Sequence, residues 1–261
     1  MKRKSRTLRA SVSKLELFGL RSLPEVRRGD NLARLVVDAA QRERLEIHSG
    51  DLFVIAQKIV SKAEGRLIRL SSMRPSEVAR QWAKLLGEDP RFLEVVLLES
   101  RRIVRMTERV LLVETHHGFT CANAGVDRSN VPGKDFVTCL PRNPDSSARK
   151  FVAGLRKLCA ARVAAIISDT FGRPWRLGLT NVAIGAAGVE VLRDLRGARD
   201  ASGHRLHATV LATADDLAAA AGLLMEKSEG VPVVLVRSYP YKQAAESARR
   251  LIRAANEDLF R

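Results

Sequence analysis

The sequence predicts a fold that mixes helices and strands, of the α/β or α+β class. Several segments repeat apolar residues at the spacing of a helix, and others are short apolar runs rich in Val, Ile and Leu. Hydrophobic residues make up 46% of the 261 residues, which suffices for one large or two small domains. Aromatic residues make up only 5%, so the core must be mainly aliphatic.

The predicted elements alternate irregularly along the chain. A helix over 31–45 has Asp30 or Asn31 as a candidate cap, and a second helix over 75–87 ends at Gly87. We expect further helices over 147–162, 214–227 and 243–260, strands over 52–55, 109–115, 163–168, 207–213 and 232–237, and either element over 91–104. Periodicity alone does not decide between the α/β and α+β classes.

The chain is strongly basic, with a net charge of +16 and a pI of about 10.6. Much of the excess lies near the start, so we predict a basic tail over residues 1–14 and one domain over 15–261. A nucleic-acid partner is one interpretation of this charge. However, the basic residues are dispersed, aromatic residues are too few for base stacking, and no zinc-finger or RNA-recognition motif occurs. We therefore expect the charge to attract polyanionic small molecules, and we keep nucleic-acid binding as an alternative.

Cysteine usage and hydropathy predict a cytoplasmic protein without a membrane segment. Cys121, Cys139 and Cys159 lack CxxC spacing, which is typical of reduced thiols. No run approaches the roughly 18 apolar residues of a membrane span. The basic N-terminal stretch is not followed by the apolar region of a secretory signal.

Three polar stretches each follow a predicted apolar strand. The first holds Gln57, Lys58 and Lys62, the second Asp127 and Asn130, and the third Asp169, Thr170, Arg173 and Arg176. Carboxylate oxygens suit Mg²⁺ or Mn²⁺, whereas ammonium and guanidinium groups bind phosphates. Each stretch alone would be an ordinary polar loop. Together they predict one site for a metal ion and phosphate groups, assembled from several strand ends. No P-loop motif is present to hold the phosphates instead.

Five long motifs carry a resemblance to a known family. They are AQKIVSKAEGR, ESRRIVR (99–105), HGFTCANAGVDRSNVP, SDTFGRPWRLGLTNVAIG and EGVPVVLVR (229–237). In order and spacing, over residues 15 to 240, the chain resembles the coenzyme F420-0:γ-glutamyl ligase family. The resemblance implies an α+β fold with mixed and antiparallel sheets, two intimately joined parts and an intertwined homodimer.

The same resemblance implies an enzyme of coenzyme F420 biosynthesis. It would be a GDP-forming ligase that joins L-glutamate, in a γ-linked chain, to F420-0. The reaction would use GTP with Mg²⁺ or Mn²⁺, and K⁺ is a further candidate ion. The carboxylate of F420-0 would first become an acyl phosphate. A related nucleotide-dependent amide ligase with another acceptor remains an alternative, since acceptor choice depends on pocket shape.

The resemblance also assigns site residues. Asp127 and Asp169 match acidic ligands of one metal, and Thr170 and Glu226 are candidates for a second metal. The nucleotide-binding positions are Leu23, Pro24, Glu25, Val26, Gln57, Lys58, Lys62, Asn130, Met225, Glu226, Lys227, Ser228, Glu229, Gly230 and Val231. With Asp127 and Asp169 we place Arg173 and Arg176 in the catalytic set, because paired guanidiniums suit phosphate or carboxylate. Between these arginines, Trp175 is expected to pack.

Overall fold

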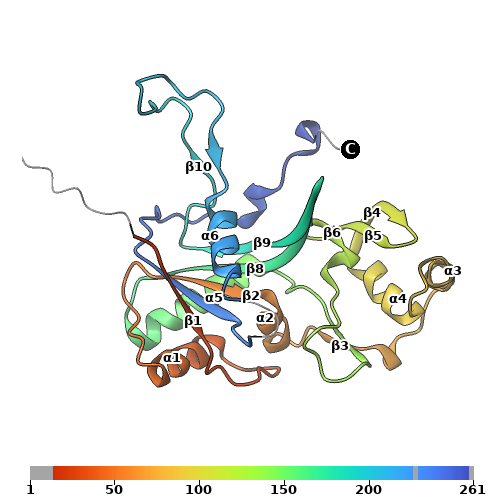
Figure 1. Cartoon of the computed structure of the whole chain (residues 1–261). Helices are drawn as coiled ribbons and strands as arrows, with labels where there is room; N and C mark the ends of the chain where they lie inside the picture. The colour runs from red at the N-terminus through yellow and green to blue at the C-terminus, as the bar shows by residue number, and fades with distance from the viewer. Residues whose placement is uncertain (1–13, 226–228, 259–261) are drawn as a thin grey trace, which may run out of the picture.

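The computed structural model describes residues 14–225 and 229–258. At its centre lies a five-stranded sheet in the order β1-β12-β2-β8-β9 (Figure 1). Its strands are β1 (Glu16–Leu20), β12 (Val233–Arg237), β2 (Leu52–Ala56), β8 (Ala164–Arg173) and β9 (Arg176–Ala187). The pair β2–β8 is parallel and the other neighbours are antiparallel, so the sheet is mixed.

Helices cover both faces of this sheet. Successive residues of a strand point to opposite faces, and both faces are apolar here, so each needs a covering layer. Phe53 and Ile55 lie in one core cluster, and Leu52 and Val54 lie in another. The first cluster includes residues of α1 (Leu32–Arg42), α2 (Gln57–Ala63) and α5 (Pro144–Cys159), and the second includes residues of α6 (Thr213–Gly222). The cap of α1 is Asn31, whose side chain accepts a hydrogen bond from a backbone N–H.

A second part of the chain lies beside the central sheet (Figure 1). It contains α3 (Glu77–Leu86), α4 (Pro90–Glu99), the antiparallel strands β4 (Ser100–Thr107), β5 (Val110–Thr115) and β6 (Thr120–Ala122), and the pair β3 (Leu67–Arg69) and β7 (Phe136–Thr138). It also has its own core cluster. The ambiguous segment 91–104 is therefore helix up to Glu99 and strand from Ser100. The α+β class with mixed and antiparallel sheets is confirmed.

The prediction of a helix over 243–260 is wrong. Over 243–258, the described part of this segment, only two short 3₁₀ turns form, η3 (Ala248–Leu251) and η4 (Ala255–Glu257). The buried carboxylate of Asp145 accepts hydrogen bonds from the Ser247 hydroxyl and the Ala248 N–H at 2.6 and 3.0 Å. These contacts attach the segment to α5 and satisfy groups that a helix would otherwise need to pair internally.

Two other predicted elements are shorter than expected. The strand over 207–213 reduces to β11 (Val210–Leu211), which pairs with β10 (Arg193–Asp194) in an exposed two-stranded ribbon. Helix α6 ends at Gly222. Two 3₁₀ turns, η1 (Leu70–Ser72) and η2 (Asn123–Gly125), complete the described elements. No helix among the described residues is long and apolar enough to cross a membrane.

The strand predicted to end at Ser168 continues to Arg173. β2 accompanies β8 only as far as Ser168, but β9 pairs with β8 to the tip of a long hairpin. Near this tip Trp175, Leu177 and Leu179 are 79%, 98% and 63% exposed. The expectation that Trp175 packs is therefore wrong for the single chain, because the hairpin carries it beyond the sheet.

Candidate active site

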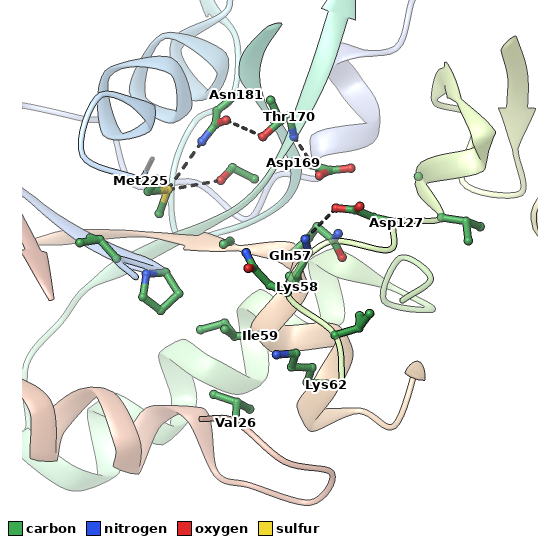
Figure 2. A pocket seen from close by; sticks show the side chains of 18 of the residues that line it. Val26, Gln57, Lys58, Ile59, Lys62, Asp127, Asp169, Thr170, Asn181 and Met225 are labelled. Carbon is green, nitrogen blue, oxygen red and sulfur yellow. Dashed lines mark hydrogen bonds and ion pairs between the residues drawn. The ribbon is translucent and has the colours of Figure 1, made fainter. Parts of the chain in front are cut away.

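A cavity of about 910 Å³ lies where the central sheet meets the second part of the chain. We call it the main cavity. Its walls come from the loop before α1, the start of α2, the segment from β6 through the loop after η2, the middle of β8 and the chain leading into β12 (Figure 2). Sequence segments more than 200 residues apart thus line one space, because β1 and β12 are neighbours in the sheet.

Lys58 and Asp127 form an ion pair inside this cavity. β2 passes directly into α2 at Ala56, so Lys58 lies in the first turn of the helix. Its ammonium lies 2.7 Å from Asp127 Oδ2 and donates to the Ser129 hydroxyl at 2.5 Å. Burial opposes ionisation of Asp127, but hydrogen bonds from Lys58 and Ser129 outweigh it and lower the pKa of that carboxyl. Asp127 is therefore an anion at neutral pH.

A second lysine lies deeper along the same helix. Lys62 is buried, and its ammonium donates to Glu25 Oε1 at 2.5 Å. One turn earlier, the Gln57 side chain accepts a hydrogen bond from the Ser61 hydroxyl at 2.8 Å. Helix α2 thus presents two ammonium groups at one wall of the cavity, and each is balanced by a carboxylate from another segment.

Asp169 and Thr170 enter the cavity from the middle of β8 rather than from a strand end. Asp169 Oδ1 accepts from the Thr170 N–H at 2.8 Å, and the Thr170 hydroxyl donates to Asn181 Oδ1 at 3.0 Å. Asn181 in turn donates to the Met225 sulfur at 3.6 Å. This chain of contacts links the hairpin to the end of the α6 segment (Figure 2).

The donor set fits a divalent cation that also binds phosphates. Figure 2 shows Asp127 and Asp169 pointing toward the same part of the cavity. Burial, together with the negative charge of Asp169, raises the pKa of the Cys121 thiol to about 12, so this wall residue stays neutral. In residues 14–225 and 229–258, no three His, Cys, Asp or Glu side chains gather into a metal cage. Two carboxylates that leave positions for substrate phosphates and water are, however, the usual protein contribution to a Mg²⁺ site.

Most of the residues assigned to nucleotide binding line the main cavity. These are Leu23, Pro24, Glu25, Val26, Gln57, Lys58, Lys62, Asn130, Met225, Gly230 and Val231, and Asp127, Asp169 and Thr170 join them. Glu229 is not among the lining residues and pairs with Arg21 at 3.1 Å. Glu226, Lys227 and Ser228 lie outside the described residues.

Arg173 and Arg176 are not among the lining residues of the main cavity. The β8–β9 hairpin carries both toward its tip, where Arg173 donates to the Leu177 carbonyl at 2.7 Å. The sequence analysis assigned no role to Ser129 or Asn181, which also contribute contacts here. Ser129 was visible as a hydroxyl two residues from Asp127. Asn181 could be found only from the hairpin register, which places it opposite Thr170.

Comparison with known proteins shows the family of the sequence. A family model described as F420-0:Gamma-glutamyl ligase matches residues 20–238. The chain belongs to this family. The matched region contains the second part of the structure, the central sheet apart from most of β1, and every residue that lines the main cavity. The resemblance inferred from the five motifs is confirmed.

Relatives within the F420-0:gamma-glutamyl ligase family match almost the whole chain. The coenzyme F420:L-glutamate ligase of Methanothermobacter thermautotrophicus is 42% identical over 95% of this chain and 99% of its own length. The proteins of the same name from Methanopyrus kandleri and Methanocaldococcus jannaschii are 44% and 40% identical. They cover 91% and 95% of this chain and 94% and 97% of their own lengths.

Proposed function

We propose that this protein is a ligase of coenzyme F420 biosynthesis that joins L-glutamate to F420-0, with GTP as the phosphoryl donor. One observation carries the proposal. This chain belongs to the F420-0:gamma-glutamyl ligase family, and its fold brings Asp127, Asp169 and the α2 lysines into one cavity of about 910 Å³. That volume suits a nucleotide or a molecule of similar size. The relatives that carry the ligase name match nearly end to end.

The reaction must activate a carboxylate before an amine can attack it. The γ-phosphoryl group of GTP moves to a carboxylate oxygen of F420-0, which gives an acyl phosphate and GDP. The neutral α-amino group of glutamate then attacks the carbonyl carbon, phosphate leaves with the former carboxylate oxygen, and the amine loses a proton. Phosphoryl transfer of this kind depends on positioning and charge neutralisation more than on covalent help from the protein.

Asp127 and Asp169 would hold one Mg²⁺ or Mn²⁺ ion, and Thr170 and Glu226 are the candidates for a second ion. When bound, the metal would neutralise phosphate charge during transfer. Lys58 and Lys62 line the cavity, and Lys58 pairs with Asp127 at 2.7 Å. Their ammonium groups would bind the phosphates as point charges, a role that fits a chain without a P-loop.

The proposal includes an intertwined homodimer. Trp175, Leu177 and Leu179 near the tip of the β8–β9 hairpin are largely exposed in the single chain. Exchange of hairpins between two copies would bury these apolar side chains and bring Arg173 and Arg176 against a second chain. Light scattering after size-exclusion chromatography would give a mass of two chains for the wild type, and the Leu177→Asp variant would shift it toward one.

Isotope transfer tests the reaction directly. F420-0 with ¹⁸O in its carboxylate would be incubated with glutamate, GTP and Mn²⁺, and both products analysed by mass spectrometry. We expect F420-0 extended by glutamate and one ¹⁸O atom in the released phosphate. Unlabelled phosphate alongside a labelled amide would exclude the acyl phosphate. No glutamate addition at all would overturn the proposed function.

A further inference from the structure

A second cavity, of about 690 Å³, lies at the turn that joins β5 to β6. We call it the arginine cavity. Its charged lining residues are Arg101 and Arg102 of β4, Arg249 of η3, Arg253 just after η3, and Glu114 of β5. Four guanidiniums thus face one carboxylate among the described lining residues. The proposed ligation reaction does not use any of these side chains.

The positive charge of this cavity is only partly balanced. Glu114 accepts from Arg102 at 2.7 and 3.2 Å and from Arg101 at 3.4 Å. In the described part of the chain, neither Arg249 nor Arg253 forms an ion pair with a side chain. Guanidinium groups bind carboxylates and phosphates in a two-pronged geometry, so a concave surface with this excess favours a ligand with several negative charges.

His117, which also lines the arginine cavity, has a ring nitrogen that needs a hydrogen-bond donor. Its Nε2 lies 2.9 Å from the Pro141 carbonyl oxygen. Because a carbonyl only accepts, Nε2 carries the proton and Nδ1 is left as an acceptor. That Nδ1 atom is buried, with no hydrogen-bond partner among the described residues. A ligand N–H would pair with this atom after the imidazole ring turns toward the cavity, whereas a phosphodiester group offers acceptors only and would leave it without a partner.

The arginine cavity is close to the main cavity. Gly118 lines one and Cys121 lines the other, and three residues of chain span at most about 10 Å. Aromatic rings connect the two walls. His117 stacks on Phe119 with centroids 5.9 Å apart, and Phe119 meets the edge of Phe171, a main-cavity residue, at 6.4 Å. A ligand group in the arginine cavity is thus within reach of a long substrate held in the main cavity.

We propose that the arginine cavity binds the α-carboxylates of glutamyl residues already attached to the acceptor. This inference rests on the proposed function. Each γ-linked glutamate adds one α-carboxylate and one amide N–H, which match Arg249, Arg253 and His117. The cavity would then favour acceptors that already carry glutamate over F420-0 itself, and it would influence how far the γ-glutamyl chain grows.

A double variant, Arg249→Gln with Arg253→Gln, tests this proposal. The measured quantity is the ratio of kcat/KM for mono-γ-glutamyl F420 to kcat/KM for F420-0. We expect this ratio to fall about tenfold or more, as the loss of charge-assisted hydrogen bonds predicts. The matched control is Arg193→Gln with Arg205→Gln, which removes two charges from β10 and from the loop between β10 and β11, outside both cavities. The control ratio should equal that of the wild type.

Isothermal titration provides an independent readout that needs no turnover. Tri-γ-L-glutamate should bind the wild type and lose about tenfold or more in affinity for the double variant, whereas GDP affinity should not change. An unchanged kinetic ratio, an equal fall in the control, or a loss of GDP affinity in place of peptide affinity would overturn the proposal. If the wild type ligates nothing, the proposed function fails, and peptide binding alone then decides whether the cavity recognises γ-glutamyl chains.

Discussion

The ammonium of Lys58 lies 2.7 Å from Asp127 Oδ2, so it forms an ion pair with the carboxylate that the proposed metal would bind. The two residues are 69 positions apart and meet because α2 and the loop after η2 form adjacent walls of the main cavity. A cation that binds Asp127 must compete with this ammonium. The displaced lysine would then be available to the nucleotide phosphates.

Lys58→Met should raise the affinity for Mn²⁺ alone, because the competing ammonium is gone, and lower the affinity for GTP. We expect changes of about tenfold in each direction, the size of one charge-assisted hydrogen bond. Titration calorimetry with Mn²⁺ alone and with GTP alone measures both. Lys84→Met, on the exposed surface of α3, serves as the control. Weaker Mn²⁺ binding by Lys58→Met would contradict the competition.

Asp127→Asn and Asp169→Asn should each lower ligation about 100-fold or more, because the metal they hold would supply several kcal/mol of charge stabilisation. Both replacements keep the side-chain shape, so circular dichroism should show a folded protein. Asp38→Asn on α1 is the matched control and should retain activity. Wild-type turnover by either site variant at saturating Mn²⁺ would remove that residue from the metal site.

Acid titration of stability tests the environment of Asp127. Its folded pKa lies below the ordinary value of 3.8, so its stabilising contribution is present above about pH 4 and is lost as the pH falls through the folded pKa. The difference in Tm between wild type and Asp127→Asn should therefore be constant from pH 8 to pH 5 and shrink in stronger acid. A difference that grows on acidification would show the opposite sign of the pKa shift.

Gly185→Ala should destabilise the protein by about 1–3 kcal/mol through overpacking. A Cβ at Gly185 in β9 would lie 2.5 Å from the backbone carbonyl carbon of Pro144, where α5 begins. Gly172→Ala is the control, because a Cβ there meets no atom within 4 Å. Urea unfolding of both variants gives the comparison. Equal midpoints would mean that α5 does not approach β9 as closely as the structure shows.

Deletion of the basic tail up to Lys14 should leave kcat and KM nearly unchanged at physiological salt. The tail precedes the region that matches the family model, which begins at residue 20, and interactions between exposed charges more than about 8 Å apart are screened at that ionic strength. Steady-state kinetics of the shortened chain measure the effect. A large fall in kcat would show that the tail contributes to the site or to the assembly.

The sequence by itself predicted the elements whose signals are local. Apolar β-rich runs gave the strands at 52–55 and 232–237, and Asn31 and Gly87 marked helix ends because caps depend on neighbouring backbone groups. Long motifs identified the family and made Asp127, Asp169 and the α2 lysines candidate site residues, all of which line the main cavity. These residues could be selected from the sequence because they lie in continuous polar segments that follow apolar segments.

Only the tertiary structure decided the features that depend on contacts between distant residues. The sequence pattern over 243–260 is helical, but hydrogen bonds from Ser247 and Ala248 to Asp145, about 100 positions away, hold this segment in another conformation. Arg173 and Arg176 lie outside the main cavity because β8 and β9 stay paired beyond the point where β2 ends, which places both arginines near the tip of the hairpin. The four arginines of the second cavity come from β4 and the C-terminal segment, and neither stretch alone is unusual in a chain with a charge of +16. Their convergence is a property of chain folding, since electrostatic and hydrogen-bond energies depend on distance in space rather than on position in the sequence.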